Sequence, residues 1–198
     1  MSGWKKRKSD SALVKKIFTS LGGLVAAGVA FGYSLYESRE ESVVPNVQVN
    51  IPVNAGRWQV TLISAKKTSL RPDGTRIGPG MQAILLEMVL QNRSGESSNI
   101  YGDLLKLRNL KNASRPQFYL DRDRESLGDL QPMMPERVTA MWEVPEAIPL
   151  PKKLEVAVEG DVFKRRDNLY AAPGWFPSGA VAHLELALSV GQKSGEMP

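Results

Sequence analysis

Alternating apolar and polar positions fill the chain from residue 46 onward, and this period of two is typical of β-strands. In the first run, Val47, Val49 and Ile51 share one face. The longest run, 80–92, has apolar side chains on both parities, which predicts a central strand buried on two faces or a strand with a bulge. The predicted strands are 46–52, 57–68, 80–92, 104–107, 117–120, 138–144, 154–158 and 183–190.

Stretches rich in Gly, Pro, Asn and Asp separate these runs, as turns do in an all-β domain. Past residue 36 no sustained helical period occurs, although residues 122–130 are compatible with one short helical turn. The pattern excludes a parallel α/β fold and predicts an all-β, antiparallel β-sandwich.

The segment 17–36 has a different pattern, with twenty residues and no charged side chain. As a helix it would be about 30 Å long, which matches the hydrocarbon thickness of a bilayer. Tyr33 and Tyr36 near its end suit the headgroup region. We therefore expect one N-terminal transmembrane helix, in which Gly28 and Gly32 form a G-x-x-x-G pattern for contact with another helix.

Two other interpretations of this segment stay open. A cleaved signal peptide also has a basic start and an apolar middle, and residues 28–30 offer small side chains at a possible cleavage site. A buried helix of a soluble protein is the third possibility, but its four glycines would each cost about 1 kcal/mol relative to Ala.

The distribution of charge along the chain predicts the direction in which the segment 17–36 crosses the membrane. The 198-residue chain has a net charge of +5, and residues 1–16 account for it with six basic side chains against Asp10. These are Lys5, Lys6, Arg7, Lys8, Lys15 and Lys16. The remainder is neutral, which argues against a nucleic-acid-binding domain. Cations before the span and net acid after it predict a cytoplasmic N-terminus in the inner membrane and a C-terminal domain outside.

These observations predict five regions. They are a basic cytoplasmic tail at 1–16, a transmembrane helix at 17–36, a linker at 37–45, a β-sandwich at 46–190 and a flexible tail at 191–198. The linker is short, so we expect the sandwich to stay close to the bilayer.

Candidate catalytic chemistry is sparse. The chain has no cysteine and one histidine, which excludes thiolate metal sites and multi-histidine metal sites. His183 begins a strand with no nucleophile at a recognisable spacing. Asp121, Asp123 and Glu125 alternate with arginines, which predicts a self-paired surface run rather than a calcium loop. We therefore expect no enzymatic activity, no metal and no cofactor.

Two further features merit attention. Trp175 and Phe176 lie between Pro173 and Pro177 in a segment that we expect to be a loop, either as a partner-binding anchor or folded over the core. Glu87 interrupts the apolar run of 80–92, and we expect it on the solvated outer face rather than in a buried contact.

The order of several short motifs resembles a bacterial family. The motifs are Trp58–Val60, a strand that ends in Asn92, Leu105–Leu107, Gln117–Tyr119, Leu130 with Pro132, and Trp142–Pro145. They resemble the extracytoplasmic immunoglobulin-like domains of unknown function that are described as similar to a telomeric-repeat-binding-factor fold. Trp142 stands where that family usually has Phe, and Asn109 where it has Asp. Over residues 56–160 the resemblance implies an immunoglobulin-like sandwich behind a signal peptide or anchor, with no agreed enzymatic activity.

The leading hypothesis is a membrane-anchored accessory subunit of a membrane or envelope complex. Its expected partners are the lipid bilayer and another membrane or envelope protein, or a second copy of the chain. The alternative is a module that binds a ligand or an envelope polymer, and an enzyme comes last.

Overall fold

The computed structural model describes residues 44–110, 113–167 and 171–191, which contain nine strands. Within these residues no helix is long and apolar enough to cross a bilayer. The predicted cytoplasmic tail, the transmembrane helix with Gly28 and Gly32, and most of the linker lie outside the described part of the chain. The strands are β1 (Val53–Ala55), β2 (Trp58–Thr68), β3 (Met81–Asn92), β4 (Leu105–Leu107), β5 (Gln117–Leu120), β6 (Glu125–Ser126), β7 (Pro135–Pro145), β8 (Lys153–Lys164) and β9 (Gly174–Val190).

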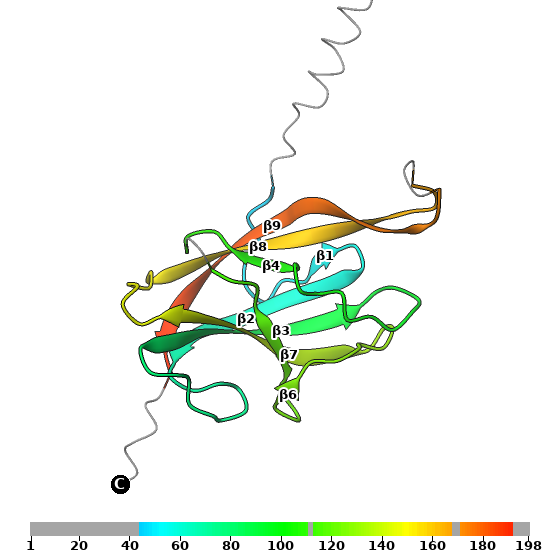
Figure 1. Cartoon of the computed structure of the whole chain (residues 1–198). Helices are drawn as coiled ribbons and strands as arrows, with labels where there is room; N and C mark the ends of the chain where they lie inside the picture. The colour runs from blue at the N-terminus through cyan, green and yellow to red at the C-terminus, as the bar shows by residue number, and fades with distance from the viewer. Residues whose placement is uncertain (1–43, 111–112, 168–170, 192–198) are drawn as a thin grey trace, which may run out of the picture. The chain divides into compact units, whose positions relative to one another are not determined.

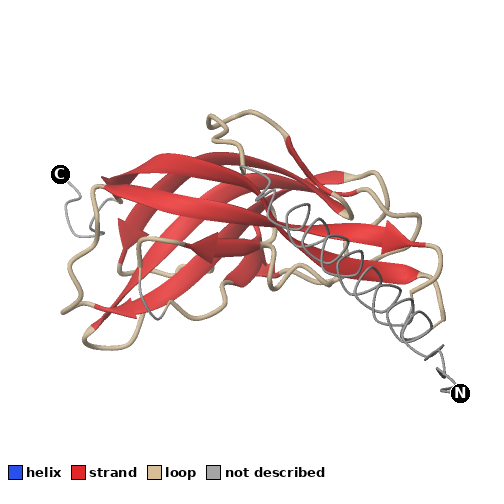
Figure 2. Ribbon diagram, turned by 90° about the horizontal axis from the view of Figure 1, so that it is seen from above, coloured by secondary structure: helices blue, strands red, loops and turns tan. Residues whose placement is uncertain are grey.

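The strands form an all-β, sandwich-like arrangement in which β9 belongs to both layers (Figures 1 and 2). One layer has the order β4–β8–β9, and the other has the order β9–β2–β3–β7–β5–β6 with β1 beside β2. All pairs are antiparallel except β2 and β9, which run parallel at Ala65–Lys67 and Leu188–Val190. A strand of seventeen residues is long enough to pair in both layers.

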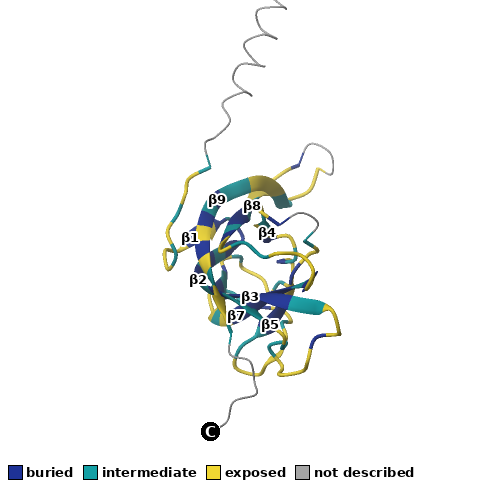
Figure 3. Cartoon of the chain, turned by 90° about the vertical axis from the view of Figure 1, so that its left-hand side faces the viewer, coloured by how far each residue is buried: buried dark blue, intermediate teal, exposed yellow. Residues whose placement is uncertain are grey.

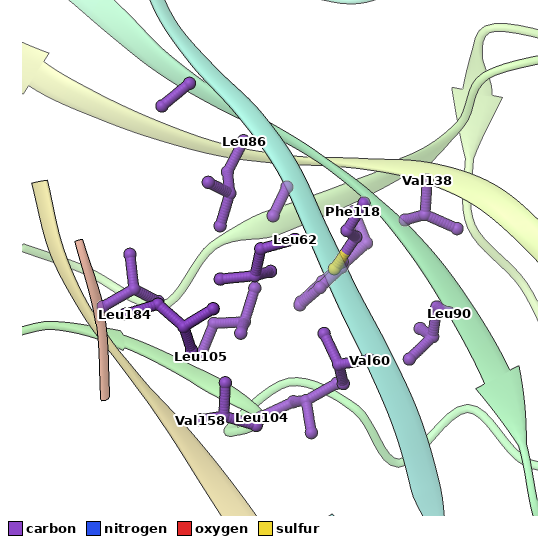
Figure 4. Packing of buried hydrophobic residues seen from close by; sticks show 14 of the residues in the cluster. Val60, Leu62, Leu86, Leu90, Leu104, Leu105, Phe118, Val138, Val158 and Leu184 are labelled. Carbon is purple, nitrogen blue, oxygen red and sulfur yellow. The ribbon is translucent and has the colours of Figure 1, made fainter. Parts of the chain in front are cut away.

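The main core lies between the two layers (Figures 3 and 4). Apolar side chains at alternate positions of β2, β3 and β7 pack against those of β8 and β9, with Leu62, Leu86 and Leu184 all at most 2% exposed. Trp58 and Trp142 are the largest fully buried side chains. Burying each such side chain contributes about 1.5–3 kcal/mol, so this interface accounts for most of the fold's stability.

A second, smaller cluster covers the outer face of β3. Ala83 and Leu85 pack there with Ile77, Tyr119 and Met141. Side chains from the β2–β3 connection, β5 and β7 therefore cover the side chains of β3 that point away from the main core. The prediction of a strand buried on both faces is confirmed.

The first predicted strand is wrong. Residues 46–52 make only a single parallel bridge, between Asn46 and His183, and the regular pairing begins at Val53. Asn50 has a positive φ of 64°, and Pro52 has no backbone donor, so the chain turns here instead of continuing extended.

The predicted helical turn at 122–130 is a hairpin. β5 and β6 pair at Tyr119–Ser126 and Leu120–Glu125, and Arg124 takes a positive φ of 58° in the turn between them. β5 was predicted at 117–120, but β6 has only two residues and is too short to show a period in the sequence.

Candidate functional site

The C-terminal end of β8 and the N-terminal end of β9 extend beyond β4 as a two-stranded arm (Figure 1). We define the arm as residues 160–164 of β8 and 174–180 of β9. Trp175 and Phe176 therefore lie in a strand, and the expected loop at 171–179 is wrong from Gly174 onward. The flanking prolines indicated a loop. Pro177 nevertheless lies in β9 opposite Asp161, at a register shift where a strand tolerates proline.

An open groove of about 720 Å³ lies against one face of the arm, and we call it the aromatic groove. Phe163 and residues 173–175 form one wall, residues 93–98 and Ile100 of the loop after β3 form the other, and Arg57 also lines it. Its volume is within the range of about 300–1,000 Å³ that is usual for ligand pockets.

A stack of three side chains forms the arm's side of the groove. Phe163 and Trp175 are cross-strand partners, and their rings meet edge to face with centroids 5.4 Å apart. The guanidinium of Arg57 lies 5.5 Å from the centre of the Trp175 ring, which is a cation–π distance. Phe163 is nevertheless 50% exposed, and Ile100 across the groove is 65% exposed. Large apolar side chains thus remain open to solvent on both walls.

Arg57 reaches this position because the turn before β2 touches the arm. Gly56 has a φ of +78°, and a Cβ atom added there would lie 1.7 Å from the carbonyl oxygen of Asp161. Only glycine allows the two backbones to approach so closely. The turn therefore places Arg57 beneath Trp175.

The charge of Arg57 is only partly compensated. Arg57 is 8% exposed, and its Nη1 donates a hydrogen bond to Ser98 Oγ over 3.2 Å. Its Nε is buried and has no hydrogen-bond partner. The Asp161 carboxylate lies 3.9 Å from Nε, within ion-pair range but beyond hydrogen-bond length. Burial raises the pKa of Asp161, and the nearby guanidinium of Arg57 offsets this only in part.

Asn92 fixes the conformation of the loop after β3, which forms the opposite wall of the groove. Its side chain is fully buried, and its Nδ2 donates to the carbonyl oxygens of Glu96 and Leu130 over 2.7 and 2.8 Å. Its Oδ1 accepts from the backbone N–H and the hydroxyl of Ser94. Trp58 adds a further bond, from Nε1 to the carbonyl oxygen of Ile100 over 2.8 Å.

Trp175 and Phe176 do not act as one aromatic pair. Successive side chains of a strand point to opposite faces, so Phe176 lies on the other face of the arm with Val162. The Lys164 ammonium lies 4.9 Å from the Phe176 ring, and Arg165 and Arg166 follow as exposed cations. The only three-cation run outside the N-terminal tail is therefore at the end of the arm.

The candidate catalytic residues lie apart from the groove. The Nδ1 atom of His183 on β9 is 3.2 Å from Nη1 of Arg108. In the turn after β5, Asp121 accepts a hydrogen bond from Thr139 and Asp123 pairs with Arg122. The expected pairing within the charge run is present for Arg122 and Asp123, and Arg122 also pairs with Glu136 on β7.

Across the described residues no cluster of three acidic or histidine side chains is arranged to hold a metal ion.

Glu87 is half-buried rather than simply solvated. It accepts hydrogen bonds from Ser64 over 2.9 Å and from Lys66 over 2.6 Å, both on the neighbouring strand β2. It therefore joins two strands and has no part in the groove.

Sequence reasoning missed Arg57 and Phe163. Phe163 gave no periodic signal, because residues 161–164 have the sequence Asp-Val-Phe-Lys, in which apolar and polar side chains do not alternate. Arg57 gave no signal, since its place under Trp175 depends on contact between the turn before β2 and an arm that lies about a hundred residues later.

Comparison with known proteins gives one structural neighbour. No family model matches the chain, and no curated protein matches it. A crystal structure of an uncharacterized β-sandwich protein from Clostridium difficile 630 is similar, with a TM-score of 0.48 and 10% sequence identity. The match covers 71% of this chain and 93% of that one.

Proposed function

We propose that this protein is an extracytoplasmic interaction subunit, held at the inner membrane by residues 17–36 and docking a partner protein through the aromatic groove. The observation that carries the proposal is the stack of Arg57, Trp175 and Phe163 beside a half-open groove. Trp, Arg and other large side chains in partly desolvated pockets supply most of the binding energy at protein interfaces.

The exposed apolar surface supports docking of a partner rather than catalysis. Ile100 and Phe163 face the same groove from opposite walls, and Val162 on the other face of the arm is 44% exposed. Apolar side chains grouped in this way mark interaction sites, whereas scattered ones do not. The proposed fold at the finer level is immunoglobulin-like, in keeping with the resemblance of residues 56–160 to the bacterial family.

The docking role is tested by photo-crosslinking in intact cells. A benzophenone amino acid in place of Phe163 should give one defined crosslinked protein, because this ring lines the groove. The matched control is Ile148, which is also exposed but lies in the β7–β8 connection at the other end of β8. Identical crosslinking patterns from the two positions would refute the docking role.

The membrane orientation is tested separately. A reporter enzyme that is active only after export, fused after Pro198, should be active if residues 17–36 span the membrane with the N-terminus in the cytoplasm. Activity of a cytoplasm-specific reporter at the same position would contradict this orientation. The mass of the mature protein then distinguishes the anchor from a signal peptide, since cleavage after Ala30 removes about thirty residues.

The volume of the groove favours one second candidate, a module that binds an envelope polymer or small ligand. Ser94, Ser97 and Ser98 line the groove opposite the aromatic wall and offer hydroxyl groups to such a ligand. Retention of the purified protein on cell-wall glycan, with no crosslinked protein from position 163, would support this candidate over the first.

A further inference from the structure

We infer that the aromatic groove recognises an acidic segment of its partner, with a carboxylate side chain seated between Arg57 and Arg93. This inference rests on the proposed docking function and specifies the chemistry of the docked chain. Arg57 from the β1–β2 turn and Arg93 from the loop after β3 both line the groove. Glu96, which is exposed on that loop, is the acidic residue in the lining, so two arginines face one carboxylate there.

The first argument is the incomplete pairing of Arg57. A buried guanidinium normally satisfies its N–H groups, because an unpaired buried donor costs about 1–3 kcal/mol. Here Nε has no hydrogen-bond partner, and the Asp161 carboxylate stays 3.9 Å away. A ligand carboxylate that binds the outer edge of this guanidinium would supply charge that the protein itself provides only in part.

The second argument is preorganisation. Trp175 lies against the guanidinium of Arg57, and Ser98 accepts from its Nη1, so the planar group is fixed before any ligand arrives. Arg93 is exposed, and its Nη1 donates one hydrogen bond to Gln59 Oε1 over 2.6 Å. Fixed arginines bind carboxylates with little further loss of side-chain entropy.

The third argument is the mixed character of the walls. Ile100, Phe163 and Trp175 offer apolar contact next to the two arginines. A peptide that alternates acidic and apolar residues matches this pattern, since its carboxylates and its apolar side chains would meet complementary groups within one groove.

Burial argues against a lipid surface as the occupant. A flat bilayer would contact the exposed cations Lys164, Arg165 and Arg166 at the end of the arm. Arg57 is only 8% exposed inside the groove, so a narrow side chain reaches it and a membrane surface does not.

The test uses the full chain, purified in mild detergent with Trp4→Phe so that Trp175 is the one tryptophan outside the core. Trp58 and Trp142 are each 1% exposed. The probe is a blocked hexapeptide of alternating Glu and Leu, and its counterpart has Gln in place of Glu. Trp175 fluorescence and calorimetry should show the Glu peptide binding about tenfold more tightly, as expected for charge-assisted hydrogen bonds.

Variants locate the binding. Arg93→Gln, at an exposed position that leaves the core intact, should weaken binding of the Glu peptide about tenfold, and Arg57→Gln should do so at least as strongly. Arg76→Gln is the control, because Arg76 is exposed in the β2–β3 connection at the opposite end of both strands. Unchanged thermal unfolding of Arg93→Gln shows that the loss is not a folding defect.

Three results would overturn the inference. They are equal affinity for the Gln peptide, equal weakening by Arg76→Gln, and displacement of the Glu peptide by inorganic phosphate or phosphatidylglycerol vesicles at lower concentrations than by free glutamate. In each case a crosslink from position 163 would leave the docking function standing, so the two proposals fail independently.

Discussion

The side-chain amide of Asn92 lies in the core and bonds to the loop that lines the groove. Its side chain is fully buried, three of its four hydrogen bonds hold the loop that forms one wall, and the fourth goes to the carbonyl oxygen of Leu130. Among the motif residues that resemble the bacterial family, Asn92 and Asn109 both act in this structural way. Asn109 donates to the carbonyl oxygen of Lys153 and accepts from the N–H of Glu155.

The variant Asn92→Ala should therefore lower the free energy of unfolding by about 2 kcal/mol or more. The carbonyl oxygens of Glu96 and Leu130 each lose one of two donors, and the backbone N–H of Ser94 loses its acceptor in a largely buried site. Urea denaturation measures the difference. Asn54→Ala is the control, because Asn54 is exposed and accepts only from the N–H of Gly56, so its loss should cost less than about 1 kcal/mol. Equal losses in the two variants would contradict this account.

At the scale of elements, the pair of β2 and β3 carries a charged link on the outer face. Glu87 on β3 contacts Ser64 and Lys66 on β2 beside the register shift between Leu62 and Ser64. The hydrogen bond from Lys66 is the main reason that the pKa of Glu87 lies below its usual value of 4.5, with Ser64 adding to it and burial opposing it.

Because the pKa of Glu87 is lower in the folded state, its stabilising contribution is present above pH 4.5 and is lost as the pH falls below it. Glu87→Gln should destabilise the protein by less than about 1 kcal/mol at pH 7, since the pair is partly exposed. The difference from the original chain should shrink as the pH falls below 4.5. Thermal unfolding across this pH range measures it. The same substitution at the exposed Glu125 of β6 should change little, and a difference at Glu87 that grows with acidity would refute the assignment.

The elements also show which parts of the fold the sequence predicts. The long strand β3 was predicted within one residue, because twelve residues with a strong apolar pattern leave little choice. The outer parts of β8 and β9 were not predicted. The arm is exposed on both faces, so its sequence lacks the alternation of buried and exposed residues that marks a strand. Two bulges in this hairpin, at Val158–Glu159 and Gly160–Asp161, further break the period.

The groove was harder to predict than the strands. Trp175 was chosen for its residue type, but Arg57, Phe163 and Ile100 come from three separate segments. Their proximity follows from the pairing of β8 with β9 and from the approach of Gly56 to Asp161. Such contacts between distant segments leave no local pattern in a single sequence.

At the scale of the whole molecule, the chain divides between residues 43 and 44, and the second unit comprises residues 44–198. Among the described residues, the two hydrophobic clusters and the side chains packed against them extend from Val47 to Leu188. These residues form a hydrophobic core within the second unit.

A fragment that begins at Val44 should consequently fold without the preceding residues. We expect a cooperative thermal transition within a few degrees of that of the full chain, followed by near-ultraviolet circular dichroism from the buried Trp58 and Trp142. A fragment that binds a hydrophobic dye and unfolds without a sharp transition would show that the first unit is needed for the fold.

The membership of β9 in both layers has a mechanical consequence. The chain enters the second unit beside β9, through the parallel bridge of Asn46 to His183, and leaves it after the parallel pairing of β9 with β2. Tension between the two ends would thus slide parallel neighbours along one another and load their hydrogen bonds together rather than one at a time. The domain is accordingly arranged to resist pulling along β9.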